Sequence, residues 1–438
     1  MLYQNNWESL NSRPVPKWFG DAKFGIFIHW GLYSVPAYAP KGFYAEWYWY
    51  ALTCQNPHEA QLKFREYHKK TYGENYDYRD FVKDFKAENF DADEWARLFQ
   101  RSGAKYINLV SKHHDGYCLF GTDYAPFWNS VDVGPHKDFC MELKNALDKT
   151  DVKFGVYHSL YEWYHPLYLK DPEEYAQKHL IPMLKELVEK YQPATLFTDG
   201  EWEQPSSVWH STDFLQWLYN ESSVKDIIVP NDRWGKETRG KLGGNFTTEY
   251  GAVYGEDSPG INEVTDTYTR PNEECRGIGG SFGFNKNETP EEYLSSKELV
   301  HMLIDLVSRG SNFLLNIGPT ADGRIPVIMQ QKLLDIGDWL SINGEGIYST
   351  VRYSLSSDER IRYTQTKDAI YTFILKFPFG SFTLNEVDFD SVCGAELLGN
   401  DIKPEISNDN GKVKLTFPVV DPDKLNGQFA YCVKLQKK

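Results

Sequence analysis

Polar side chains follow several short apolar runs of this chain, at the points where strands of a sheet would end. The run 194–197 is followed closely by Asp199 and Gly200, and the run Phe24–Ile28 is followed by His29. In a β/α barrel the carboxyl ends of all strands lie on one face, so we expect these side chains to gather there. With one residue from the insertion after the first run, the candidates are His29, Glu46, His113, His114, Tyr157, Asp199, Arg233 and Glu249.

Two carboxylates among hydrogen-bond donors suit a neutral, hydroxyl-rich substrate. Retaining glycoside hydrolysis needs one carboxylate to attack the anomeric carbon and a second to protonate the departing oxygen. Asp199 and Glu249 are the carboxylates that we pair in this way, with the histidines, Tyr157 and Arg233 as hydroxyl ligands. Taken singly, each residue also has a structural explanation. Asp199, for example, is followed by glycine, and Asp-Gly is common in turns. Barrel stability, however, does not require polar groups at so many successive strand ends.

Other chemistries fit the sequence less well. Histidines suggest a metal, but His29 is followed by Trp30 and Gly31 rather than by a second histidine one residue further. His113 and His114 are adjacent, and on an extended chain their side chains would point in opposite directions. The sequence contains no G-x-S-x-G, GxGxxG or GKS/GKT motif for a serine hydrolase or a nucleotide site. We therefore expect neither a metal nor an organic cofactor.

The composition limits the partners. The 438 residues carry 62 acidic and 47 basic side chains, a net charge of -15, which disfavours binding to nucleic acid or to an anionic membrane. The 13 Trp and 29 Tyr are a weak indication of carbohydrate binding, since aromatic rings pack on the apolar faces of sugars, but core packing explains them equally well. The six cysteines are scattered without a CxxC pair, which indicates buried thiols rather than a zinc or redox site.

Alternating strands and helices predict an α/β fold, a (β/α)8-like TIM barrel, over residues 1–348. Predicted strands 24–28, 104–111, 153–157, 194–197, 227–229, 245–248 and 312–317 alternate with predicted helices 91–99, 138–148, 173–191, 213–220, 296–308 and 326–342. The insertion from Tyr33 to about Asn89 is longer than a connection needs, so we expect it to form part of the site wall. After about Ser349, short strands without helices predict a C-terminal antiparallel β-sandwich over 349–438.

Motifs in a fixed order point to a known family. They are PKWFGDAKFGIFIHWGLYSVPA (16–37), KHHDG (112–116), FGVYHSLYEWYHPLY (154–168), LFTDGEWE (196–203), NDRWG (231–235), RGIGGSFGFN (276–285) and LLNIGPTADG (314–323). From about Trp7 to its end, the chain resembles the α-L-fucosidases of glycoside hydrolase family 29, which include animal lysosomal and bacterial members. The resemblance implies exo-acting hydrolysis of terminal α-linked L-fucose with net retention, and fucosylated oligosaccharides or glycoconjugates as partners.

The resemblance also implies roles for individual residues. Asp199 falls on the nucleophile, and Glu249 of TTEYG falls on the acid/base of the bacterial pattern, with Glu274 and Glu256 as competing carboxylates. A general acid must be protonated, so we expect burial and the charge of Asp199 to raise the pKa of Glu249. The implied fucose ligands are His29, Glu46, His113, His114, Tyr157, Phe197 and Arg233. Some relatives carry tryptophan where Phe197 stands, and the loop 254–272 does not align with them.

The N-terminal residues bear on the compartment. Met1 to Pro16 lacks a hydrophobic signal region, and the chain has no apolar stretch of about 18 residues. We expect a protein of the secretory route, in a periplasm, a lysosome or the exterior, whose signal is absent from this chain; a cytoplasmic location is the alternative.

Overall fold

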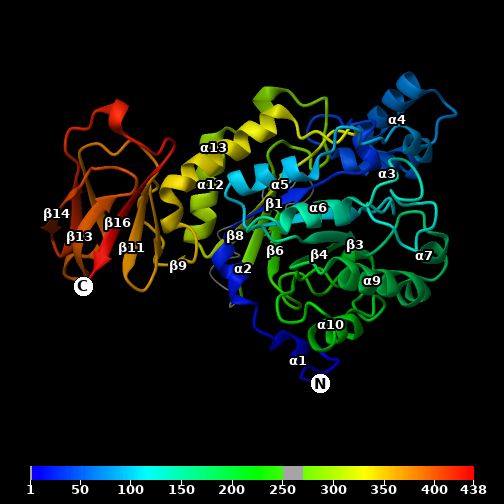
Figure 1. Cartoon of the computed structure of the whole chain (residues 1–438), viewed down its shortest axis with the longest axis horizontal. Coiled ribbons are helices and arrows are strands. Elements are labelled where there is room, and N and C mark those ends of the chain that lie inside the picture. Colours follow the sequence, from blue (N-terminus) through cyan, green and yellow to red (C-terminus); the bar gives the residue numbers. More distant parts are fainter. Residues whose placement is uncertain (1, 250–269) are drawn as a thin grey trace.

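Eight parallel strands form one sheet in the computed structural model, which describes residues 2–249 and 270–438 (Figure 1). Their order is β5-β4-β3-β2-β1-β8-β7-β6, and a parallel bridge between Asn231 and Asn245 joins the two outer strands. The sheet therefore closes as the predicted barrel. The strands are β1 (Phe24–Ile28), β2 (Tyr106–Lys112), β3 (Val156–Ser159), β4 (Thr195–Asp199), β5 (Val229–Pro230), β6 (Phe246–Glu249), β7 (Asn272–Gly277) and β8 (Ser311–Ile317).

Helices surround this sheet in the expected alternation. Acidic side chains cap several of them: Asp91 accepts from the backbone N–H of Glu94, and Asp138 accepts from that of Met141. The helices are α1 (Trp7–Asn11), α2 (Lys17–Ala22), α3 (Tyr48–Thr53), α4 (Glu59–Tyr72), α5 (Ala92–Arg101), α6 (Phe139–Leu147), α7 (Pro166–Lys170), α8 (Pro172–Tyr175), α9 (Ile181–Tyr191), α10 (Ser211–Asn220), α12 (Ser296–Ser308) and α13 (Val327–Asn343). None of the helices described is long and apolar enough to cross a membrane.

Two features of the barrel differ from the sequence prediction. The predicted helix 173–191 is interrupted by a π-helical turn, Ala176–Leu180. Pro182 lies just beyond this turn. Because proline has no backbone N–H, it cannot donate the usual hydrogen bond of an α-helix, and the wider π-helical turn avoids the need for that bond. Strand β7 was not predicted, because its sequence, NEECRG, carries four polar or charged residues and no apolar run.

Large side chains close the interior of the barrel below the strand ends. Phe19, Tyr106 and Val110 are almost fully buried there together with Leu314. Phe27, Tyr157 and Phe197 belong to the same cluster and lie nearer the carboxyl ends of their strands. A site at those ends is consequently a blind pocket and not a channel through the barrel.

The C-terminal strands form two antiparallel sheets at one end of the molecule (Figure 1). The sheet orders are β13-β16-β11-β10-β9 and β12-β15-β14, and a separate apolar core lies between the sheets, as the sandwich prediction requires. These strands are β9 (Val351–Arg352), β10 (Ile361–Gln365), β11 (Ala369–Ile374), β12 (Ser381–Asp388), β13 (Val392–Leu397), β14 (Glu405–Asp409), β15 (Lys412–Thr416) and β16 (Tyr431–Lys437).

The sandwich packs against the last two helices of the barrel. Tyr371, Phe373 and Cys432 belong to the main core of the barrel rather than to the sandwich core. The indole N–H of Trp339 on α13 donates to the carbonyl of Ala430 at 2.8 Å. Figure 1 shows α12 and α13 between the barrel and the sandwich, with α3 and α4 at the opposite end of the molecule.

Candidate active site

The predicted site residues lie together. One pocket of about 310 Å³ opens at the carboxyl ends of the barrel strands, a size typical of small-molecule sites. It is lined by every predicted residue, namely His29, Glu46, His113, His114, Tyr157, Phe197, Asp199, Arg233 and Glu249. Eight of these come from the ends of β1 to β6, whereas Glu46 comes from a 3-10 turn, η2 (Ala45–Trp47), in the long insertion. The insertion therefore does form part of the wall.

Asp199 is the last residue of β4, and its carboxylate is held from two sides. Its Oδ1 accepts from Nη1 of Arg233 at 2.6 Å, and its Oδ2 accepts from the hydroxyl of Tyr157 at 2.9 Å. Burial alone would raise the pKa of Asp199, but Arg233 and Tyr157 outweigh it and hold the pKa below its ordinary value. The carboxylate is thus ionised near neutral pH. Gly200 permits the turn that follows, since it has φ +79° and a Cβ there would lie 2.3 Å from Tyr161.

Arg233 connects the two carboxylates of the predicted pair. Its Nη2 donates to Oε1 of Glu249 at 2.5 Å, and its Nε donates to Thr247 at 3.0 Å. Both carboxylates bind one rigid guanidinium, so they are close neighbours on the same wall of the pocket. Arg239 also donates to Oε1 of Glu249, at 3.3 Å from the more exposed side.

The protonation state of Glu249 differs from the sequence prediction. Burial favours a raised pKa, as we expected, but Arg233 and Arg239 together outweigh burial and the charge of Asp199. The pKa of Glu249 is therefore lowered in the ligand-free site. The sequence motifs gave no indication that Arg239 would reach this carboxylate.

The competing carboxylates are placed differently. Glu274 precedes Cys275, which lines the pocket, and neighbouring residues of a strand point to opposite faces. Glu274 accordingly points away from the pocket and accepts a hydrogen bond from the hydroxyl of Thr248. Glu46 faces the pocket, accepts from the backbone N–H of Gly283 at 2.8 Å, and has a pKa raised by burial to about 7. Glu256 and the loop that did not align fall largely within 250–269, outside the described residues.

The three histidines are neutral hydrogen-bonding groups. Burial lowers the pKa of His29 to about 4 and the pKa values of His113 and His114 well below the usual range. Both His113 and His114 line the pocket, with ring centres 4.2 Å apart, although an extended chain would separate them. The reason is that β2 ends at Lys112, so the two residues leave the strand conformation.

Hydrogen bonds on the far side of the rings fix the nitrogens that face the pocket. The hydroxyl of Ser159 donates to Tyr161 O at 2.5 Å, so its oxygen accepts from Nδ1–H of His114 at 2.6 Å. This leaves Nε2 of His114 as an acceptor, 3.6 Å from Oδ2 of Asp199. Each of these two acceptors can receive a hydrogen bond from a ligand hydroxyl in the pocket.

Comparisons with known proteins agree with this geometry. The family model described as alpha-L-fucosidase matches residues 1–345. An alpha-L-fucosidase of Dictyostelium discoideum is 40% identical over 440 residues, which cover 96% of this chain and 92% of that protein. The chain belongs to the alpha-L-fucosidase family.

Two further relatives extend the comparison. A plasma alpha-L-fucosidase of Rattus norvegicus is 42% identical over 393 residues, covering 86% of this chain and 81% of that protein. A crystal structure of Thermotoga maritima alpha-fucosidase in complex with a mechanism-based inhibitor is 34% identical. It has a TM-score of 0.83 and covers 99% of each chain. The match along the whole chain confirms the predicted family and the predicted barrel with its C-terminal sandwich.

Sequence reasoning missed several pocket residues of this alpha-L-fucosidase family member. Trp47, Trp202 and Arg239 line the pocket, as does Phe282. Trp202 lies within the LFTDGEWE motif and Phe282 within RGIGGSFGFN, so the motifs did contain these two residues, and Trp47 directly follows Glu46 in the insertion. Arg239 had none, because it follows the NDRWG motif in a polar segment without periodicity.

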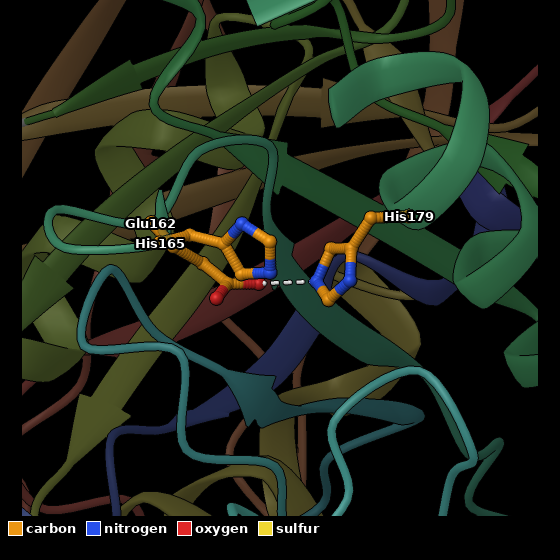
Figure 2. A group of neighbouring side chains, drawn as sticks. All are labelled: Glu162, His165 and His179. Carbon is orange, nitrogen blue, oxygen red and sulfur yellow. Dashed lines mark hydrogen bonds and ion pairs between the residues drawn. The ribbon is translucent and has the colours of Figure 1, made fainter. Parts of the chain in front are cut away.

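A second cluster of ligand-type side chains lies outside the pocket. Among residues 2–249 and 270–438, Glu162, His165 and His179 have ligand atoms within 4.8 Å of one another (Figure 2). Oε1 of Glu162, however, already accepts from Lys112 Nζ at 2.8 Å, as well as from Nε2–H of His179 at 2.8 Å. Lys112 is fully buried, so a dication here would face an ammonium group that cannot move into solvent. These residues do not fit a metal site in this alpha-L-fucosidase family member.

Proposed function

We propose that the protein is an exo-acting, retaining α-L-fucosidase that removes terminal α-linked L-fucose from oligosaccharides or glycoconjugates. The observation that carries the proposal is the pair Asp199 and Glu249 on one guanidinium in a blind pocket. Retaining glycosidases place their two carboxyl groups about 5–5.5 Å apart, and a shared guanidinium is consistent with such a spacing. The inhibitor in the related Thermotoga maritima enzyme is described as mechanism-based, which agrees with covalent chemistry in this family.

The first proposed step forms a fucosyl-enzyme. A carboxylate oxygen of Asp199 attacks the anomeric carbon, and the bond from that carbon to the leaving oxygen breaks. The proton of the Glu249 carboxyl group passes to the leaving oxygen. In the second step Glu249 takes a proton from water, the water oxygen attacks the anomeric carbon, and Asp199 is released as a carboxylate.

Protonation of Glu249 is the demanding part of this scheme. Arg233 and Arg239 favour its charged form in the ligand-free site, which suits the base of the second step but not the acid of the first. We propose that the acid form becomes populated as the pH falls toward the pKa of Glu249, so that natural fucosides are cleaved best at acidic pH. The scheme also needs Asp199 to stay ionised at that pH, and its lowered pKa favours this.

Neutral groups are proposed to hold the sugar hydroxyls. His29 donates its Nδ1–H to Asn316 at 2.7 Å, which leaves Nε2 free to accept a hydroxyl proton. Nδ1 of His113 is buried without a partner in the structure, an arrangement that a ligand hydroxyl would satisfy. Phe197 contributes an apolar surface and packs beneath Arg233 at 4.9 Å. No step of the scheme needs a cofactor.

The two parts of the chain are proposed to have different tasks. Residues 1–348 would carry catalysis, and 349–438 would support α12 and α13. Asp388 of the sandwich supports this division, since it is exposed, pairs with Lys412 and is not among the residues that line the candidate active site. A barrel without residues 349–438 that stayed folded and fully active would contradict the supporting role.

We also propose a secretory-route compartment, because one relative is named for plasma. Fractionation of the native source tests this proposal.

Hydrolysis of p-nitrophenyl α-L-fucoside tests the proposal, with the β-L-fucoside and β-galactoside as controls. We expect release from the α-fucoside alone, and NMR should show the α-anomer of fucose as the first product. Absence of p-nitrophenol release at high protein concentration would refute the proposed activity and would favour a sugar-binding protein that keeps the barrel fold.

A further inference from the structure

The pocket has an outer half whose surface differs from the inner one. Inner residues such as Tyr157 and His114 are each 1% exposed. At the outer half, Trp202 is 40% exposed and Tyr50 is 36% exposed, and both line the same pocket. Large aromatic rings left open to water in the same pocket as the proposed catalytic pair call for an explanation.

Trp202 is held in this position by its surroundings. It lies in the 3-10 turn η5 (Glu201–Glu203), directly after the Gly200 turn that follows Asp199. Its ring meets His114 edge to face at 5.5 Å and Tyr161 at 5.8 Å. Trp47 lies almost parallel to it, at 19° and 6.4 Å between ring centres. The ring is therefore pre-organised, although it is not covered.

We propose that Trp202, with Tyr50, binds the sugar to which the fucose is attached, by stacking on the C–H face of a neutral pyranose ring. The inference rests on the proposed function and concerns the leaving-group side of the same site. Glu249 must touch the glycosidic oxygen in the proposed scheme, so the leaving sugar extends from the inner residues toward the open part of the pocket, which Trp202 and Tyr50 also line. Arg239 lines the same pocket but is paired with Glu249, so the uncovered ring of Trp202 is the feature from which we infer recognition of a neutral sugar.

Two substrates separate this subsite from the fucose site. α-L-Fucosyl fluoride has no ring in its leaving group, whereas a trisaccharide with fucose α-linked to a hexose has one. For Trp202→Ala we compare kcat/KM for the trisaccharide with kcat/KM for the fluoride. We expect the ratio of the two to fall about three- to tenfold, because the variant loses one aromatic contact with the leaving sugar. Trp202→Phe should recover part of the ratio. Phe379→Ala, which removes an exposed ring of the sandwich, is the matched control and should leave the ratio unchanged.

An unchanged ratio in Trp202→Ala would overturn the subsite. If the wild-type protein hydrolyses neither substrate, the proposed function itself fails, which is a different result. Hydrolysis of the fluoride by each variant also shows that the variant is folded.

Transfer to an added sugar gives an independent test. In the fucosyl-enzyme formed from the fluoride, a hydroxyl oxygen of a methyl hexoside can replace water at the anomeric carbon, with its proton going to Glu249 and Asp199 leaving. By microscopic reversibility the acceptor uses the leaving-group subsite. Trp202→Ala should therefore lower the ratio of transfer to hydrolysis by a similar factor, and an equal ratio in both proteins would contradict the proposal.

Discussion

Two buried clusters of this molecule use the same kinds of side chain for different ends. Asp199 binds Arg233 and Tyr157 and lies near His114, whereas Glu162 binds Lys112, Tyr175 and His179. Each cluster thus places a carboxylate against a cation, a tyrosine and a histidine. The Asp199 cluster lines the pocket, whereas Glu162, Lys112, Tyr175 and His179 are not among its lining residues. Figure 2 shows the contact between Glu162 and His179. Residue types alone consequently do not distinguish the proposed catalytic centre from a cluster outside the pocket.

The distinction lies in access and in charge. Side chains of Asp199 and Glu249 keep 13% and 22% of their surface exposed, compared with 7% for Glu162 and none for Lys112. Arg233 is shared by two carboxylates, so the pocket has spare acceptor capacity for a ligand. Lys112 instead has one carboxylate, whose Oε1 is saturated by three donors. The candidate active site therefore differs from the Glu162 cluster in two ways: its carboxylates are accessible to a ligand, and they retain hydrogen-bonding capacity.

The largest effect is expected at Asp199, the proposed nucleophile. Asp199→Ala should lower kcat/KM by about 10³-fold or more, since no other carboxylate replaces the attacking oxygen. Fucose affinity, measured by calorimetry, should largely survive because the hydroxyl ligands remain. Asp388→Ala removes an exposed carboxylate of the sandwich and should keep the wild-type rate. A near-normal rate in Asp199→Ala would remove this residue from its role.

Loss of the acid/base should depend on the substrate. Glu249→Ala should slow natural fucosides about 10²–10⁴-fold but aryl fucosides with good leaving groups much less, because only the former need protonation. Azide should restore the rate on the aryl substrate by attacking the stranded fucosyl-enzyme. Glu274→Ala is the comparison, since Glu274 points away from the pocket. If Glu274→Ala shows the azide rescue and Glu249→Ala does not, the assignment is wrong.

Substitutions in the Glu162 cluster should lower the stability of the protein and leave its catalytic rate nearly unchanged. Glu162→Gln leaves Lys112 buried without its counter-charge and should lower the free energy of unfolding by about 3–5 kcal/mol. The double variant Lys112→Met, Glu162→Leu should recover much of this loss. Denaturant unfolding measures both, and kcat/KM per folded molecule should stay within a few-fold of wild type. A rate loss as large as that of Asp199→Ala would mean that the cluster takes part in catalysis.

The smallest expected effect concerns pH. Arg239 lowers the pKa of Glu249, so Arg239→Met should raise that pKa. The acid form of Glu249 disappears above its pKa, and a raised pKa therefore moves the falling limb of kcat/KM for natural fucosides to higher pH. Because Arg239 is partly exposed, the shift should be small. Arg79→Met, which removes an arginine paired with Asp77 at the surface, should produce no shift, and an equal shift in both variants would contradict the electrostatic explanation.

The sequence predicted the elements whose local patterns are strong. Strand β1 has the predicted bounds, and α12 begins and ends where its amphipathic pattern does. The polar strand β7 was missed because its acidic side chains are satisfied only by distant residues. Glu273 accepts from Tyr106, and Glu274 accepts from Thr248. Such tertiary pairing leaves no local signal in the sequence.

The sequence predicted residues that line the pocket, but it did not predict the electrostatics of the pocket. Strand ends and motifs identified Asp199, Arg233 and Glu249, because the barrel brings such ends together. The lowered pKa of Glu249 and the open ring of Trp202 depend on how the segments after β4 and β5 fold back over the pocket. Those segments are short turns without periodicity, and side-chain distances across them cannot be predicted from sequence patterns.

Trapping of the covalent intermediate tests the central claim most directly. A fucosyl fluoride that carries fluorine at C2 forms the fucosyl-enzyme, because fluoride leaves readily, and slows its hydrolysis, because the fluorine destabilises the positively charged transition state. Proteolysis and mass spectrometry of the inactivated protein should locate one fluorofucosyl group on Asp199. A label on Glu46 or Glu249, or first release of the β-anomer from an α-fucoside, would contradict the mechanism proposed for this pocket.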